Sequence, residues 1–279
     1  MKQLNIKKLF GLLENWRIRF GVIVLSLMLF IAIFAPVIAP FNPIDISITN
    51  RLRSPSLQHL FGTDSFGRDV FSRVIWGTRI SLLVGISTTF FVGIFGSIIG
   101  LITGYFEKKT RVFMRILDGI MAFPAILLGL ALMAVFGPST MNVILAISIV
   151  FTPRAARIVR SCVLSVSEVD YVEAARSIGN THLKIMLKHV FPNVVSPLII
   201  QLSGTFANAI LNEAALSFLG VGQPPPMPSL GSILSEGRNV IWQSPWITFF
   251  SGFAIFIIVL ALNILGDGLR DELDPKYRR

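Results

Sequence analysis

Long apolar stretches without charge are the feature of this sequence that most limits how the chain can fold. They lie at 20–38, 80–106, 116–136, 137–153, 190–212 and within 239–266. Asp118 is the only charged residue among them. In the hydrocarbon core of a bilayer, about 20 apolar residues form one spanning helix, because each backbone amide must find its partner within the segment. The pattern therefore predicts an all-α, polytopic membrane protein with six transmembrane helices.

The expected boundaries follow from these stretches. The fourth stretch is short, so its helix should continue past Pro153. We expect an N-terminal segment at 1–19, one transmembrane domain at 20–279, and a long loop at 158–189. The expected spans are 20–38, 80–106, 116–136, 137–157, 190–212 and 246–265.

The placement of basic residues gives a direction to these spans. The net charge is +10, which by itself would suit either nucleic acid or a membrane surface. If the N-terminus is cytoplasmic, 19 of the 25 Lys and Arg residues fall on the inner side of the membrane. Both termini are therefore predicted to be cytoplasmic. No basic patch with interleaved aromatic residues lies outside the membrane flanks, so we expect no nucleic-acid partner.

The inner loop at 158–189 carries the most structured pattern. Ser167 is a suitable N-cap for a first short helix, Gly179 a suitable stop, and Thr181 a suitable cap for a second. Apolar residues recur at helical spacing in both, namely Val169, Val172, Ala175 and Ile178, then Leu183, Met186, Leu187 and Val190. Periodicity alone leaves two readings open: a compact knob that offers an apolar face to a partner, or a loop lying on lipid headgroups.

The residues of this loop resemble a known motif. Glu173-Ala-Ala, then Gly179, then a hydrophobic stretch ending in Phe-Pro-Asn at 191–193, is similar to the EAA loop of ABC importer permeases. Three more segments, at 59–73, 213–222 and 266–275, resemble the second permease subunit of the dipeptide, oligopeptide and nickel ABC importers. The resemblance thus covers most of the chain.

This resemblance implies a type I ABC importer permease in a prokaryotic cytoplasmic (inner) membrane. The implied partners are a homologous permease subunit in a heterodimer, two cytoplasmic ATPase subunits, an extracytoplasmic substrate-binding protein and the lipid bilayer. In that family the EAA loop docks into a groove on the ATPase. The residues assigned to coupling here are Glu173, Ala174, Ala175, Gly179, Leu183 and Met186.

Catalytic and cofactor motifs are missing from the sequence. It contains no Gly-x-x-x-x-Gly-Lys-Ser/Thr, so it has no phosphate-binding loop of that type, and ATP is expected to be used by partner subunits. Neither a His-Glu-x-x-His nor a Gly-x-Ser-x-Gly motif occurs. A single cysteine, Cys162, excludes an intrachain disulfide and a cysteine-cluster metal site. We therefore expect no enzyme activity, bound cofactor or metal in this chain.

Charged residues in the outer loops are candidates for contacts with a binding protein. We expect 67–76 to form an amphipathic helix on the outer interface. The charges are expected to be exposed and suited to orienting a protein surface, although an ordinary solvated face is the alternative. The candidates are Arg68, Asp69, Arg73, Glu236 and Arg238.

Two features inside the spans remain. Glu213 lies near the outer end of the fifth span, where it would line the translocation path or hydrogen-bond a neighbouring helix. Gly96, Gly100 and Gly104 lie four residues apart and predict a face for close helix packing.

The resemblance implies that this chain forms half of the translocation pathway for short peptides. The alternatives to this function are of two kinds. The same machinery could carry nickel, a metal chelate or an opine, since the binding protein is separate from this chain. A different class would be an ion-coupled secondary transporter or channel, or a membrane scaffold without transport. The spans lack the buried chain of Asp, Glu and His that a proton relay needs, which disfavours the ion-coupled class.

Overall fold

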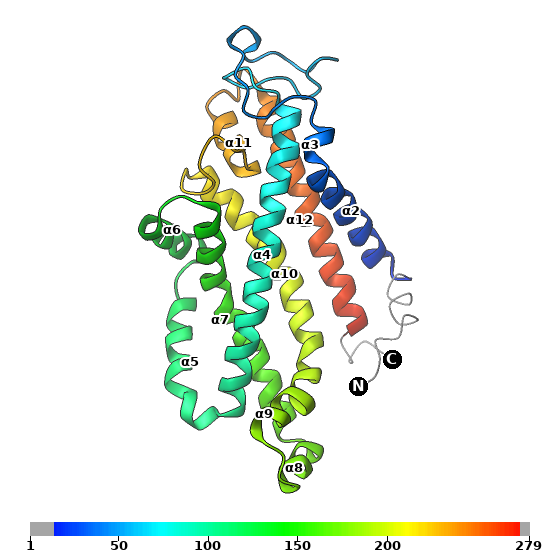
Figure 1. Ribbon diagram of the computed structural model, residues 1–279, viewed down its shortest axis with the longest axis vertical. Coiled ribbons are helices and arrows are strands. Elements are labelled where there is room, and N and C mark those ends of the chain that lie inside the picture. Colours follow the sequence, from blue (N-terminus) through cyan, green and yellow to red (C-terminus); the bar gives the residue numbers. More distant parts are fainter. Residues whose placement is uncertain (1–13, 274–279) are drawn as a thin grey trace.

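The computed structural model describes residues 14–273, and within this range every regular element is a helix. Figure 1 shows the long helices side by side, with short helices at both ends of the bundle. In chain order they are α2 (Trp16–Ile33), α3 (Ala35–Ile38), the 3₁₀ turn η1 (Ile48–Asn50), α4 (Val70–Tyr105), α5 (Glu107–Met121), α6 (Ala125–Phe136), α7 (Thr140–Ser167), α8 (Asp170–Ser177), α9 (His182–Ile185), the π-helical segment η2 (Met186–Val190), α10 (Phe191–Phe218), α11 (Leu230–Arg238) and α12 (Pro245–Leu273).

The described residues contain five helices that are long and apolar enough to cross a membrane, and a sixth candidate that is broken. The five single candidates are α2, α4, α7, α10 (reached through α9 and η2) and α12. The broken one is α5 with α6, whose axes are bent by 95°. The expectation of one continuous helix at 116–136 was therefore wrong. Pro124 lacks an N–H and disfavours helical geometry at Phe123, which ends α5 and restarts the chain as α6.

Side-chain caps set several helix boundaries. The Asp69 carboxylate accepts a hydrogen bond from the Ser72 N–H at 2.7 Å and begins α4, about ten residues before the predicted span. The segment 67–76 is thus mostly the first turns of α4, and the predicted interfacial helix was wrong. Ser139 caps α7, which runs through Pro153 as expected and continues to Ser167.

Glycines bring α4 and α7 close together. Gly96, Gly100 and Gly104 face Ala155, Val159 and Val163 of α7, and a β-carbon added at Gly100 would lie 2.6 Å from the Ala156 carbonyl oxygen. The predicted small-residue packing face is therefore confirmed. In a membrane this packing is a main source of association, since lipid is as apolar as the helices.

The two ends of the bundle differ. We call the end with 39–69 and α11 the loop end, and the opposite end, from which α8 and α9 project, the knob end (Figure 1). α2 begins and α12 ends toward the knob end. Arg17 and Asp271 form an ion pair of 2.6 Å between these two helices.

Candidate functional site

The knob, residues 170–185, consists of α8 and α9 joined by a glycine turn. Gly179 has φ of +79°, a left-handed conformation that favours glycine. The Thr181 hydroxyl accepts a hydrogen bond from the Lys184 N–H at 3.4 Å, so the predicted second cap is confirmed. The first was wrong: α7 continues through Ser167, and α8 begins at Asp170.

Apolar packing anchors the knob to the bundle. Val172, Ala175 and Ile185 are at most 4% exposed and share a core with Val159 and Val163 of α7. This face of the knob is therefore buried against the protein's own helices and is not available to lipid headgroups.

Polar contacts add to this anchor. The Tyr105 hydroxyl at the end of α4 lies 2.9 Å from Nδ1 of His182 in α9. Asn193 of α10 donates to the Tyr171 hydroxyl of α8 at 3.0 Å. Each of these bonds joins the knob to a different long helix, α4 or α10.

The six residues assigned to coupling divide into two groups in the structure. Glu173, Ala174, Gly179 and Leu183 are exposed on the knob, where a partner could reach them. Ala175 and Met186 are only 4% and 9% exposed. The latter pair faces the bundle, and therefore supports the knob rather than offering a contact surface.

The knob continues directly into a membrane helix. The segment η2 has π-helical geometry and joins α9 to α10 without a break, so that His182–Phe218 is one helical rod. The knob is therefore continuous with a helix that reaches the loop end.

At the loop end, the predicted exposure of the charged residues was wrong for three of five. The side chains of Asp69, Arg73 and Arg68 are 1%, 2% and 11% exposed, whereas Glu236 is 35% exposed. Arg238 is the only one of the five that is exposed, and its guanidinium lies 5.1 Å from the centre of the Phe218 ring. The sequence pattern could not distinguish a solvated face from a network of charges that satisfy one another.

These buried charges form a network between α4, the 39–69 segment and α11. Arg73 donates to both carboxylate oxygens of Glu236, at 2.6 and 2.9 Å, and pairs with Asp64. Arg68 bridges the same two acids, at 2.7 Å to Asp64 and 2.6 Å to Glu236. The network thus fixes α11 and the loop onto the first turns of α4.

Glu213 also links helices. It is 1% exposed, and its two carboxylate oxygens accept hydrogen bonds from Ser81 of α4 at 2.7 Å and from Ser217 at 2.8 Å. Of the two roles considered from the sequence, the geometry therefore favours the interhelical one.

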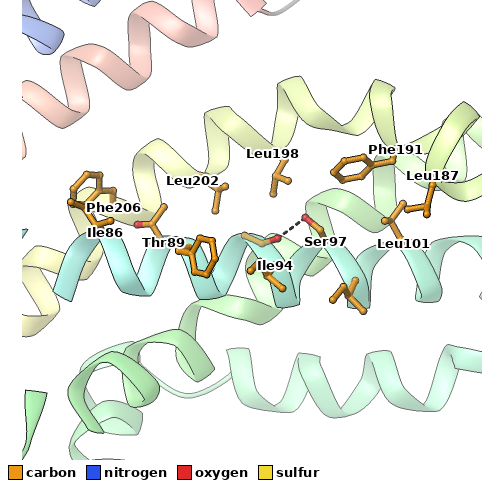
Figure 2. Close-up of a pocket in the computed structure, with 13 residues that line it drawn as sticks. Ile86, Thr89, Ile94, Ser97, Leu101, Leu187, Phe191, Leu198, Leu202 and Phe206 are labelled. Carbon is orange, nitrogen blue, oxygen red and sulfur yellow. Dashed lines mark hydrogen bonds between the residues drawn. The ribbon is translucent and has the colours of Figure 1, made fainter. Parts of the chain in front are cut away.

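A groove of about 660 Å³ lies between α4 and α10, shown in Figure 2. Its walls are apolar, including Ile86, Leu198 and Phe206, and the Ser97 hydroxyl is already bonded to the Gly93 carbonyl at 2.5 Å. A groove without free polar groups is a poor site for a polar substrate but suits lipid or an apolar helix. Within 14–273, no group of three or more His, Cys, Asp or Glu side chains could hold a metal ion.

Sequence reasoning missed a column of arginines on α7. Arg157 pairs with Asp118 of α5, and the Arg160 guanidinium lies 3.3 Å from the Glu107 carboxylate. Arg154, one turn further into the apolar part of the helix, lines a cavity at the α5–α6 break. The spacing of three residues between these arginines in an apolar helix was the available signal.

Comparison with known proteins identifies the class of this fold and site. Residues 94–279 match the family model described as "binding-protein-dependent transport system inner membrane component". The chain belongs to this family, and is the permease subunit of an ABC importer. Residues 11–55 match a second model, "N-terminal TM domain of oligopeptide transport permease C", in agreement with the resemblance noted in the sequence.

Similar proteins cover nearly the whole chain. A putative peptide transport system permease protein of Brucella abortus is 43% identical over 96% of this chain and 90% of its own length. The dipeptide transport system permease protein DppC of Alkalihalophilus pseudofirmus is 44% identical over 92% of this chain and 85% of its own. The glutathione transport system permease protein GsiD of Pectobacterium atrosepticum is 42% identical over 92% and 86%.

A solved structure shares the fold. A chain of the MetNI methionine ABC transporter, in an inward-facing conformation, matches with a TM-score of 0.59 over 72% of this chain and 97% of its own, at 19% identity. The predicted fold class, an all-helical ABC importer permease, is confirmed.

Proposed function

We propose that this chain forms half of the translocation pathway of an ATP-driven importer of short peptides. The names of the relatives support this substrate class, since they are peptide, dipeptide and glutathione permeases. In the proposed assembly, a homologous permease subunit forms the other half, two ATPase subunits supply the energy, and an extracytoplasmic binding protein delivers the peptide. The chain itself binds no cofactor.

The knob is the structural observation that best supports this proposal. It projects from the bundle, exposes Glu173, Ala174 and Leu183, and is held by packing and hydrogen bonds to α4, α7 and α10. A rigid projection with exposed charged and apolar residues suits docking into a groove on a partner. We infer that this partner is an ATPase subunit.

The rod formed by α9, η2 and α10 suggests how closure of the ATPases would act. When two knobs move together, α10 would move with its knob, and α4 would follow through the Tyr105–His182 contact. Such rigid-body motion switches access between the two sides of a membrane. The Glu213 bonds would then carry the motion from α10 to the loop-end half of α4.

Orientation in the membrane is part of the proposal. We propose that the knob end, with both termini, is cytoplasmic and that the loop end faces outward, in the cytoplasmic membrane of a prokaryote. The distribution of Lys and Arg supports this orientation.

Uptake by reconstituted vesicles tests the function. The two permeases and the ATPases are inserted into liposomes, and a labelled dipeptide is supplied on its binding protein. We expect uptake that requires ATP and both kinds of subunit, and that fails with a Walker-A lysine variant of the ATPase. ATP-driven uptake of nickel, a metal chelate or an opine but not of peptides would overturn the substrate class. Uptake driven by an ion gradient alone would instead indicate a secondary transporter. Absence of any uptake would indicate a scaffold.

A further inference from the structure

Three arginines form a column on one face of α7. Arg160, Arg157 and Arg154 are separated by three residues each, so they lie above one another along the helix. The first two are paired with Glu107 and Asp118 of α5. Arg154 is exposed and forms no ion pair or side-chain hydrogen bond with any residue in 14–273.

Arg154 lies on the knob-end half of α7, level with the apolar helices around it. Its neighbour Ala155 packs against Gly96, nine residues before the end of α4 at Tyr105. At 1.5 Å per residue this places Arg154 about 14 Å from that end of α4. A charged residue among apolar helices is costly unless it meets water or a partner of opposite charge, which makes Arg154 a candidate for a functional site.

The chain also breaks at this level. Arg154 lines a cavity of about 170 Å³ with residues of α5, of the 122–124 break and of α6, among them Met121, Phe123 and Ala125. Non-helical backbone at membrane depth is tolerated only where protein buries it or where it borders a water-filled space. The unpaired charge of Arg154 and the non-helical backbone at 122–124 are two separate observations. Both indicate that water reaches this cavity during transport.

We propose that Arg154 binds the C-terminal carboxylate of the peptide as it passes through the membrane. The inference rests on the proposed import of peptides. A guanidinium matches a carboxylate with two parallel hydrogen bonds, and this geometry is available only to a side chain that is not already paired. The cavity of about 170 Å³ has room for a terminal carboxylate beside Arg154. Arg157 and Arg160 are satisfied within the chain and are not part of this site.

Transport of paired substrates by the complete reconstituted importer tests the proposal. A labelled dipeptide and its C-terminal amide are each loaded to saturation on the binding protein, and uptake is measured for the wild type, Arg154→Gln and Arg154→Lys. We expect Arg154→Gln to lower the acid-to-amide ratio of uptake rates about tenfold, since a charge-assisted hydrogen bond contributes at least this factor. Arg154→Lys keeps the charge but not the two parallel hydrogen bonds, so its ratio should fall between those of the wild type and Arg154→Gln. Arg157→Gln is the matched control, and should leave the ratio unchanged.

Each other outcome has a distinct meaning. If Arg154→Gln slows uptake of the acid and the amide equally, or slows neither, Arg154 does not bind the carboxylate. If the variant no longer co-purifies with the second permease, Arg154 pairs with an acid of that subunit, and the proposal is also overturned. If the wild type imports neither peptide but imports another substrate, the proposed function has failed, and with it the basis of this site.

Discussion

Arg73 shows how much a single residue at the loop end supports. Its guanidinium is the shared partner of Asp64 and Glu236, and the first of these acids is buried. Removing one partner of a buried ion network leaves the remaining charges without compensation, which typically costs about 3–5 kcal/mol. We therefore expect Arg73→Ala to lower the unfolding midpoint of the purified chain in detergent by several degrees, as measured by thermal denaturation.

Arg238→Ala is the control for this prediction, because Arg238 is exposed and forms no ion pair within 14–273. Its midpoint should stay within about a degree of the wild type. If Arg73→Ala behaved in the same way, the network would contribute nothing to stability. Docking of a binding protein is tested more cleanly at Arg238, whose replacement does not disturb the fold.

Glu213 leads to a second prediction at this scale. Glu213→Ala leaves the hydroxyls of Ser81 and Ser217 without their acceptor, and each unpaired buried group costs about 1–3 kcal/mol. Glu213→Gln keeps one acceptor oxygen. We expect the alanine variant to lose stability and transport together, and the glutamine variant to keep at least half of the wild-type uptake. Full loss of uptake in a stable glutamine variant would instead place the carboxylate in the transport path.

At the scale of elements, the packing of α4 on α7 depends on glycines, which have no side chain to hold the two helices apart. The added methyl of Gly100→Ala would lie 2.6 Å from the carbonyl oxygen of Ala156, so the helices must separate. Gly119 of α5 has nothing within 4 Å of an added β-carbon. We expect Gly100→Ala to lower the thermal midpoint and Gly119→Ala to hold or raise it, since alanine favours helix by roughly 1 kcal/mol. Equal effects would contradict the packing role.

The knob gives an element-scale test of coupling. Glu173→Lys reverses an exposed charge, and Gly179→Val forces a branched side chain into a left-handed backbone with φ of +79°. Neither residue is part of the buried anchor, so both variants should still insert into the membrane. We expect substrate-stimulated ATP hydrolysis and uptake to fall at least tenfold. Normal transport by both variants would remove the coupling assignment, and Lys188→Glu outside the knob controls for a general charge effect.

Elements were predictable where a local signal decides them. Gly179 and Thr181 marked the turn and the second helix of the knob, because left-handed backbone and capping hydroxyls act over a few residues. The break at Pro124 was overlooked because an apolar stretch around a proline still resembles one span. The extension of α7 through Ser167 had no local signal, since it depends on packing with α4 and α10.

At the scale of the whole molecule, orientation can be tested with single cysteines in a Cys162→Ser background. Leu57 at the loop end is 100% exposed and Ile178 on the knob is 80% exposed. In intact cells, we expect an impermeant maleimide to label Leu57→Cys, and to label Ile178→Cys only after permeabilisation. The reverse pattern would invert the proposed orientation and place the knob out of reach of a cytoplasmic ATPase.

The membrane architecture was readable from the sequence because hydrocarbon permits so few backbone structures. The candidate site was only partly readable. Exposed Glu173 lay within a contiguous motif, but the pairing of Arg73 with Glu236 joins residues 163 positions apart. Such pairs form only when the helices pack together, so they cannot be predicted from the order of charged residues along the sequence.

The length of α4 has a consequence for the surroundings of the importer. Its 36 residues correspond to about 54 Å, well beyond the roughly 30 Å of hydrocarbon. If the hydrocarbon begins at Ile80, as expected from the sequence, the ten residues before it raise the loop end by about 15 Å, which exceeds the thickness of a headgroup layer. A soluble protein that settles on this raised platform has no need to touch lipid. The rate at which such a protein associates with the loop end should therefore depend on ionic strength. It should depend little on whether the lipids beneath are anionic or neutral.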